Sequence, residues 1–191
     1  MLNKALKRFF DLTISFLFLL ILSPIFFIIT ILIRFTSAGA ALHFSKRVGQ
    51  DNKIFLMPKF RSMFIDAPQL ATHLMTSPDQ YVTPVGKFLR KTSLDELPQL
   101  WSIFIGDMSL VGPRPALFNQ DDLVQLRTQK NIHTLKPGLT GWAQINGRDE
   151  LPIPTKVDFD FYYYQNQSFY LDLKVLALTF RKVLRADGVS H

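Results

Sequence analysis

The sequence contains no cysteine, so neither a disulfide framework nor a thiolate metal site can form. It also lacks internal repeats and low-complexity tracts. Its 191 residues suit a single domain that can bury a real core. The four histidines are far apart and show no metal-ligand spacing, so we interpret them as loop or surface residues. They are His43, His73, His133 and His191.

The net charge is strongly positive, at +7 with a pI near 9.7. Such a charge indicates an anionic partner, which could be a nucleic acid, a phosphorylated substrate or an anionic membrane surface. The basic residues are spread among motifs and no nucleic-acid-binding fold is recognisable, so we expect no nucleic-acid partner. Eighteen Phe and five Tyr in so basic a chain favour a protein at a lipid boundary.

A long apolar run follows the first residues: no charge occurs between Asp11 and Arg34. As a helix this run would extend about 33 Å, enough to cross a hydrocarbon core of ~30 Å. It is too long for the apolar region of a cleaved signal peptide, and no small-residue cleavage site closes it. Ser23-Pro24 lies at its midpoint, where proline removes a backbone hydrogen bond and predicts a kink.

Basic residues stand on both sides of the apolar run, with Lys4, Lys7 and Arg8 before it and Arg34 and later cations after it. The positive-inside rule draws both ends toward the cytoplasm. A helix that enters the membrane, bends at Ser23-Pro24 and leaves on the same side satisfies both ends. The residues alone leave this re-entrant helix and a kinked full span both open.

The rest of the chain predicts short, alternating elements. Residues 38–60 form a hairpin pattern around "GQDNK", and residues 66–84 form a loop with a single helical turn. Helices are expected over "VGKFLRKT", "LPQLWSIFIGDM" and residues 116–131, whereas "SLVGPRP" and "LKPGLTGWAQINGR" predict irregular chain. Two helices are expected in the last third, separated near "QNQS". The second is amphipathic and basic, and could lie in the membrane interface or pack on the soluble core.

The string "TSLDELPQLW" places two carboxylates side by side, Asp95 and Glu96. Ser93 and Glu96 have the spacing of a capping box, in which each side chain accepts from a backbone amide of the first turn. Alternatively, Asp95 is the cap, and Pro98 then falls at a helical position whose N–H is not needed. Both interpretations place the two acids at the N-terminus of a helix.

A chemical interpretation of the same pair arises because basic residues surround it in the sequence. With Mg²⁺ bridging, and Arg or Lys neutralising phosphate oxygens, one carboxylate can attack phosphorus while the other holds the metal. A helix N-terminus adds positive potential for phosphates. The sequence therefore permits phosphoryl transfer without requiring it.

Several strings together are more specific than any one. In this order and spacing they resemble the bacterial sugar transferase family, the monotopic polyprenol-phosphate phosphoglycosyl transferases. The resemblance runs over nearly the whole chain, and the third string is the most specific. The strings are "KRFFDLTIS…LSPIF", "MPKFRSM", "RKTSLDELPQLWSIFIGDMSLVGPRP", "LKPGLTGWAQINGR" and "FDFYYYQNQSFYLDLKVL".

The resemblance implies transfer of a sugar 1-phosphate from a UDP-sugar to undecaprenyl phosphate, with release of UMP, at the cytoplasmic face of the bacterial inner membrane. This would be the first membrane step of surface-glycan synthesis. It implies a covalent phosphosugar on Asp95 and an Mg²⁺ ion held by Glu96 beside Asp95. Positions that match further active-site residues of the family, taken as substrate or phosphate contacts, are Lys59, Arg90, Arg114, Asp160 and Arg148.

The resemblance also implies a minimal form of the fold. We expect an α+β, mostly helical chain, with a re-entrant membrane helix over residues 1–36, broken at Ser23-Pro24. A catalytic domain over residues 37–191 would carry a small hairpin and interfacial amphipathic helices.

Rival interpretations are a membrane-bound glycosyl transferase that releases UDP and a non-catalytic protein that docks on anionic lipid. The transferred sugar, the glycan pathway and the oligomeric state stay open. A homo-oligomer and contact with downstream glycosyltransferases are both compatible with the sequence.

Overall fold

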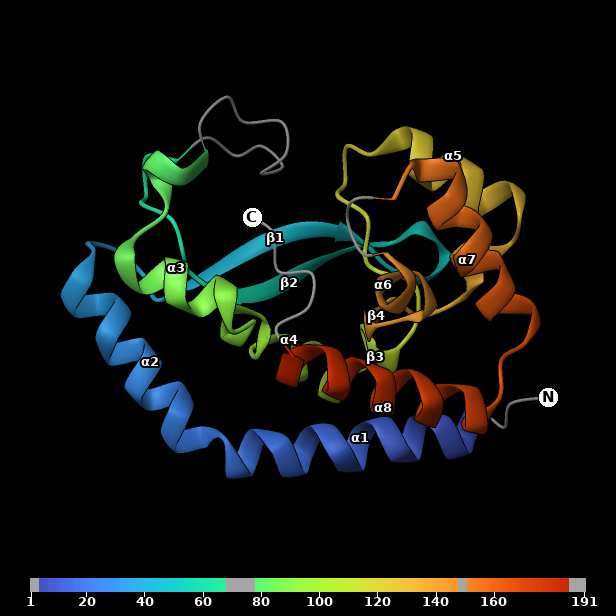
Figure 1. Cartoon of the computed structure of the whole chain (residues 1–191), viewed down its shortest axis with the longest axis horizontal. Helices are drawn as coiled ribbons and strands as arrows, with labels where there is room; N and C mark the ends of the chain where they lie inside the picture. The colour runs from blue at the N-terminus through green and yellow to red at the C-terminus, as the bar shows by residue number, and fades with distance from the viewer. Residues whose placement is uncertain (1–3, 68–77, 148–150, 186–191) are drawn as a thin grey trace.

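The chain folds into helices arranged around two small pairs of strands (Figure 1). The structure, a computed structural model, describes residues 4–67, 78–147 and 151–185. The prediction of an α+β, mostly helical chain with a small hairpin is confirmed. The hairpin runs lengthwise through the molecule, with α3 toward one end and α5 and α7 toward the other.

The apolar N-terminal run forms two helices, α1 (Lys4–Ile21) and α2 (Ser23–Thr36), which meet at a bend of 59°. Pro24 lies in the first turn of α2, where its missing N–H costs nothing, and the Ser23 hydroxyl donates to the Leu20 carbonyl over 2.8 Å. The predicted kink is therefore confirmed. Among the described helices no single one has the length and apolarity to cross a bilayer, whereas this bent pair together has both.

Polar side chains of α1 attach it to the rest of the molecule. Arg8 donates to the carbonyls of Ile103 and Phe104 over 2.6 and 2.7 Å, and so satisfies the C-terminal end of a short helix, α4 (Gln99–Ile105). The buried Asp11 accepts from the Leu110 amide over 3.1 Å. In the sequence, Arg8 and Asp11 are only charges that flank an apolar run. In the structure, Arg8 holds α1 against α4, and Asp11 holds it against the backbone at Leu110.

The predicted hairpin is confirmed as β1 (Leu42–Val48) and β2 (Ile54–Phe60), joined through the short 3₁₀ helix η1 (Gln50–Asn52). The antiparallel register places Lys59 opposite His43 and Met57 opposite Ser45. Since alternate residues face the same side, one face of β2 carries both the buried Met57 and Lys59. The hairpin thus aims Lys59 toward the interior of the molecule.

The strings around the carboxylate pair fold into short helices. A 3₁₀ turn, η3 (Pro78–Tyr81), precedes α3 (Pro84–Lys91), and a second 3₁₀ turn, η4 (Leu94–Glu96), leads into α4. The capping-box prediction is wrong: Ser93 has φ 56° and its side chain caps nothing. Asp95 is not the cap either, because α4 begins after Pro98. Because neither acid caps a helix, both side chains are available for other contacts.

Two segments predicted to be irregular form a parallel strand pair. β3 (Ser109–Val111) pairs with β4 (Gly138–Thr140), and α5 (Asp121–Gln129) and η5 (Ile132–Thr134) form the crossover between them. Their glycines allow this: a Cβ on Gly138 would overlap the Gly112 amide nitrogen. The expected irregular loop after residue 135 also contains α6 (Trp142–Asn146). The structure of this region depends on a close approach of two backbone segments, which the local propensities of its residues do not predict.

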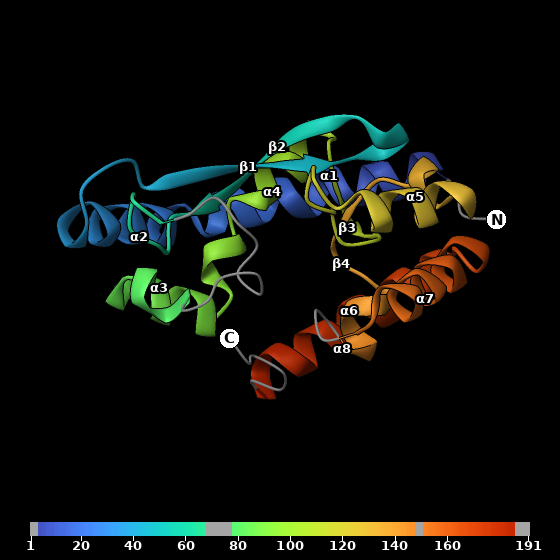
Figure 2. The same cartoon turned by 90° about the horizontal axis from the view of Figure 1, so that it is seen from above.

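The last third contains two helices, as predicted, α7 (Ile153–Gln165) and α8 (Phe169–Arg185). Leu171 and Val175 of α8 are buried in the main core, so that face packs on the protein. Lys7 of α1 donates to Asp172 over 2.6 Å, and Figure 2 shows the two helices separating from this contact toward the end of α8. The opposite face of α8 exposes Leu173 and Phe180 to the outside.

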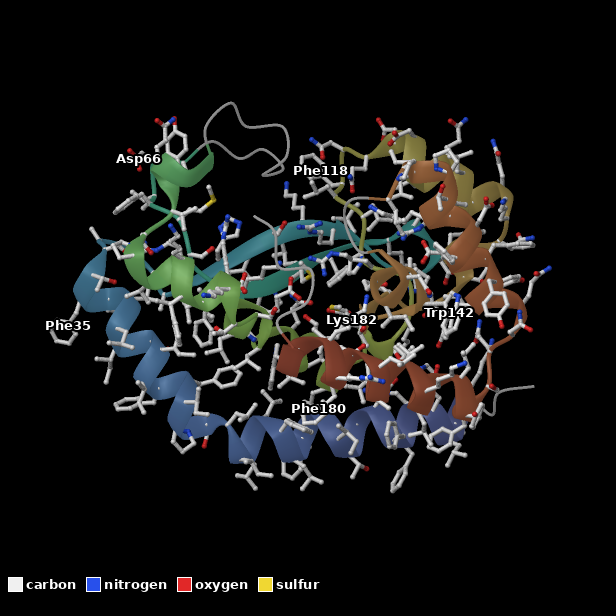
Figure 3. The ribbon with its side chains drawn as sticks, in the orientation of Figure 1. Phe35, Asp66, Phe118, Trp142, Phe180 and Lys182 are labelled. Carbon is white, nitrogen blue, oxygen red and sulfur yellow. The ribbon has the colours of Figure 1, made fainter. Side chains whose placement is uncertain are left out.

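Apolar side chains are exposed along α1 and α2 to an extent unusual for a surface in contact with water. Phe35, 85% exposed at the end of α2, points away from the rest of the molecule in Figure 3. The others with at least half of their surface exposed on these two helices are Phe9, Phe16, Leu20, Ile21, Phe27 and Ile28.

The Arg8 contacts give a stability prediction. Arg8→Met removes a charged donor from two carbonyls at the end of α4, so we expect the free energy of unfolding to fall by about 2 kcal/mol. Denaturation in detergent micelles, followed by the combined fluorescence of Trp101 and Trp142, measures this loss. Lys4→Met is the matched control, since Lys4 is exposed on the same helix and should change stability by less than about 0.5 kcal/mol. Equal losses in both variants would contradict the assignment.

Candidate active site

The centre of the site is the Glu96 carboxylate. One of its oxygens, Oε1, accepts from Lys59 Nζ over 2.8 Å and from Arg114 Nη2 over 3.1 Å. The Glu96 and Lys59 side chains are each about one-fifth exposed, and Arg114 about one-third, so the cluster is reachable from outside. Three segments far apart in the sequence therefore meet at one oxygen atom.

Asp95 lies beside this cluster, buried, in the same 3₁₀ turn. Burial raises its pKa above the ordinary range, and the neighbouring negative charge of Glu96 adds to that effect, while nearby cations only partly offset it. Burial alone would also raise the pKa of Glu96, but Lys59 and Arg114 outweigh it and hold that pKa well below its usual range. Adjacent carboxyls with pKa values displaced in opposite directions are suited to different chemical roles.

The local chain explains how both acids reach the site. Ser93 adopts a left-handed conformation at φ 56°, which turns the chain sharply out of α3. The 3₁₀ turn η4 then presents Asp95 and Glu96 consecutively, ahead of Pro98, which directly precedes α4. The motif "SLDELP" is thus a turn between two helices, and the Glu96 side chain contacts cations instead of a backbone amide.

The segment after β2 supports the site from the other side. Arg61 is buried and donates to the Ser37 carbonyl over 2.9 Å, so it fixes the end of α2. Ser62 accepts from Arg90 Nε over 2.9 Å, and the positive charge of Arg90 acts on Asp95. Three residues of "KFRS" thus have separate partners: Lys59 contacts Glu96, Arg61 holds the end of α2, and Ser62 accepts from Arg90.

Asp160 lies apart from these contacts. It is 1% exposed on α7, and its Oδ2 accepts from Arg127 Nε over 3.0 Å and from Arg127 Nη2 over 2.6 Å. Burial raises the pKa of Asp160, and Arg127 lowers it in part. Asp160 reaches the carboxylate pair only indirectly, since Arg127 also donates to the backbone carbonyl of Arg114.

The structure brings together Lys59, Glu96 and Arg114 by direct contact, with Asp95 and Arg90 beside them. Arg148 lies outside the described residues.

Two residues near the site were missed by sequence reasoning. Arg127 sits in an apparently ordinary polar helix, and no local pattern marks it. His43 was interpreted as a loop or surface residue and is exposed, but it lies in β1 directly opposite Lys59. Partial burial of its ring lowers the pKa of His43, and the positive charge of Lys59 lowers it further. The hairpin register could have placed His43 beside Lys59, had the strand boundaries been known.

The donor set is compatible with Mg²⁺. Magnesium uses one or two carboxylates together with substrate phosphates and water, and does not need a complete protein cage. Within residues 4–67, 78–147 and 151–185, no group of three or more acidic or histidine side chains forms such a cage. Asp95 and Glu96 are adjacent oxygen donors with cations nearby that could hold phosphate.

Comparison with known proteins shows the family to which this chain belongs. The profile of the bacterial sugar transferase family matches residues 2–186. The chain belongs to that family. It is 43% identical over 97% of its length to the uncharacterized sugar transferase EpsL of Bacillus subtilis, of which it covers 91%.

Two relatives whose names give a sugar-phosphate transfer are longer than this chain. The chain is 36% identical over 97% of its length to the undecaprenyl-phosphate galactose phosphotransferase of Salmonella typhimurium, and covers 42% of that protein. It is 40% identical over 93% of its length to the UDP-glucose:undecaprenyl-phosphate glucose-1-phosphate transferase of Escherichia coli, and covers 40% of it. In both cases this chain matches less than half of the relative.

The charge distribution predicts how Glu96 titrates. Lys59→Met should raise the Glu96 pKa toward its ordinary range, and by more than Arg114→Met, because Lys59 is the closer cation. The chain contains only two glutamates, Glu96 and Glu150, so ¹³C-carboxyl glutamate labelling and NMR titration without Mg²⁺ follow Glu96 directly.

The control for this titration is Lys46→Met. Lys46 is exposed in β1, and its register with Leu56 places it on the face of the hairpin opposite to Lys59. It should leave the Glu96 titration unchanged. A Glu96 pKa that stays low in Lys59→Met would show that Lys59 is not the dominant cation.

Proposed function

We propose that this chain transfers a sugar 1-phosphate from a UDP-sugar to undecaprenyl phosphate and releases UMP. The observation that carries the proposal is the Asp95–Glu96 pair, in which Glu96 is neutralised by Lys59 and Arg114 while Asp95 lies buried beside it. Relatives named for undecaprenyl-phosphate sugar phosphotransfer support the substrate class.

In the first half-reaction an Asp95 carboxylate oxygen attacks the sugar-bearing phosphorus. The bond between that phosphorus and the bridging oxygen breaks, UMP leaves with the electron pair, and a phosphosugar ester of Asp95 remains. In the second half-reaction an oxygen of undecaprenyl phosphate attacks the same phosphorus and releases the Asp95 carboxylate. No net proton is gained or lost in either half-reaction, so the proposed chemistry requires no general base.

The raised pKa of Asp95 favours this role, since a more basic carboxylate is the better nucleophile once ionised. Arg114 and Arg90 carry fixed positive charge close to Asp95, where the phosphate oxygens would lie. Glu96, ionised over the whole working pH range, keeps Lys59 and Arg114 in place.

Glu96 and Asp95 would hold Mg²⁺ together with the diphosphate of the donor. When bound, the ion would stabilise negative charge on the phosphate oxygens and on departing UMP. The chain's own contribution is to present adjacent carboxylates and to surround the phosphates with cations.

We further propose that the bent pair α1–α2 enters the cytoplasmic leaflet and returns to the same side. The exposed apolar side chains of both helices and the bend at Ser23-Pro24 support this arrangement. Attachment of Arg8 and Asp11 to the catalytic part keeps the start of α1 on the side of the active site. The outward apolar face of α8 would add an interfacial contact.

The activity is tested by nucleotide release. Purified, detergent-solubilised protein with Mg²⁺, undecaprenyl phosphate and a panel of UDP-sugars should release UMP from at least one donor. Asp95→Asn should lower the rate by at least about 10³-fold, because the nucleophile is lost. Asp158→Asn, an exposed acid on α7, should retain the wild-type rate.

The released nucleotide distinguishes the rival reactions. UDP in place of UMP would indicate glycosyl transfer, and no nucleotide from any donor would favour a non-catalytic membrane role. UMP release that survives Asp95→Asn would place the nucleophile elsewhere. Donor dependence would at the same time identify the transferred sugar.

The orientation of the N-terminus tests the membrane arrangement. Replacing Ser23 and Pro24 together by Leu should straighten the helix, since the missing backbone hydrogen bond is restored. A straight helix is long enough to span, so a tag at Met1 should move from the cytoplasm to the far side of the membrane. Labelling of the tag in intact and permeabilised cells measures its side. A tag that stays cytoplasmic in the double variant would show that the bend does not depend on this pair.

A further inference from the structure

Arg127 of α5 and Asp160 of α7 form a buried ion pair in which two nitrogens of the arginine donate. Arg127 directs Nε and Nη2 at one oxygen of Asp160, over 3.0 and 2.6 Å. The Arg127 and Asp160 side chains are 9% and 2% exposed. The Asp160 side chain is therefore too deeply buried to contact a substrate the size of a sugar phosphate.

The remaining arm of Arg127 points toward the active site. Its Nη1 donates to the backbone carbonyl of Arg114 over 2.8 Å. Only a planar guanidinium presents donors in two directions at fixed geometry, so one residue can hold the Asp160 carboxylate and the Arg114 carbonyl together.

The "GPRP" loop has a particular need for such a contact. Pro113 and Pro115 carry no amide hydrogen, so the loop can be fixed largely through its carbonyls. Each of four successive carbonyls, from Pro113 to Ala116, is held by a donor from another segment. The donors are the Gly138 amide at 2.9 Å, Arg127 Nη1 at 2.8 Å, Arg47 Nη1 at 3.2 Å and the Val48 amide at 3.0 Å.

Stability alone is a weak reason for this pair. A buried ion pair is often no more stabilising than apolar side chains of the same volume. Buried apolar residues, including Leu123, Ile132 and Val157, surround this part of the core, so an apolar pair would suit the site. The contact with the Arg114 carbonyl indicates that the Arg127–Asp160 pair has a function other than stability.

We propose that Arg127 and Asp160 are positioning residues: they fix the Arg114 backbone so that its guanidinium meets Glu96 and the phosphates of the donor. This inference rests on the proposed function and assigns Asp160 a role other than direct substrate contact. Asp160 holds Arg127, Arg127 holds the carbonyl of Arg114, and Arg114 Nη2 reaches Glu96 Oε1 at 3.1 Å.

The first test is kinetic. Arg127→Lys keeps the positive charge but has a single ammonium, which cannot serve both acceptors, so kcat/KM for UMP release should fall about 10- to 100-fold. Because Arg127 acts through Arg114, the double variant Arg127→Lys/Arg114→Met should be no slower than Arg114→Met alone. Losses that multiply in the double variant would overturn the proposal.

The matched control is Lys130→Met. Lys130 at the end of α5 donates to Asp158 of α7 over 2.6 Å, and Asp158 is 69% exposed. This ion pair joins the same two helices without touching Arg114, so its loss should leave kcat/KM unchanged. A drop as large as that of Arg127→Lys would mean that helix pairing matters, and not the Arg114 contact.

A second variant guards against misfolding. Arg127→Met/Asp160→Leu removes both charges and leaves none unpaired in the interior. Its circular dichroism should match the wild type, while kcat/KM should still fall about 10- to 100-fold because the Arg114 carbonyl has lost its donor. A folded variant with wild-type kcat/KM would overturn the proposal.

A readout independent of turnover separates this inference from the proposed reaction. In protein labelled with ¹³C-carboxyl glutamate, at fixed pH, the Glu96 signal reports its contact with Arg114, and Glu150→Gln assigns it. Arg127→Lys should shift the signal in the same direction as Arg114→Met, and Lys130→Met should not. An unshifted signal would overturn the positioning role. If the wild type released no UMP, the proposed reaction would be wrong. The Glu96 signal would still test whether Arg127 positions Arg114.

Discussion

The Glu96 carboxylate is the contact on which the site depends. It joins β2 through Lys59, the loop after β3 through Arg114, and the 3₁₀ turn that carries Asp95. Without an anion there, two cations would lie close together and repel each other. With it, the cluster keeps positive charge near Asp95, and this charge only partly offsets the burial that raises the Asp95 pKa. The same cations therefore act differently on the two adjacent acids. They hold the pKa of Glu96 low, but they do not cancel the effect of burial on the pKa of Asp95.

The same centre is tied to the apolar helices. α4 follows the acidic turn directly, and Arg8 of α1 satisfies its last carbonyls. Asp11 holds the amide of Leu110 in β3, which leads into the loop of Arg114. A helix whose outer face is apolar therefore fixes two of the three segments that supply the active centre. In the proposed reaction, the lipid-bound acceptor and the soluble donor meet at this junction.

Much of this could be predicted from the sequence, and the failures have physical causes. The bend at Ser23-Pro24 and the hairpin follow from local rules, because proline and turn residues act over a few positions. The strand pair β3–β4 was missed, since it depends on backbones approaching at Gly112 and Gly138 across the whole of α5. The capping box was wrong because Glu96 finds distant cations, which stabilise it more than a backbone amide would.

The chemical inventory can be read from the order of the amino acids: adjacent acids, dispersed cations, an apolar run broken by proline, and motifs specific enough to indicate a family. Which of these residues meet depends on how the elements pack. The fold placed Lys59 and Arg114 on one oxygen of Glu96, and it withdrew Asp160 into a buried pair with Arg127. The reason is that local patterns act over a few residues, whereas charge pairing across 18 to 37 positions depends on how strands and helices pack.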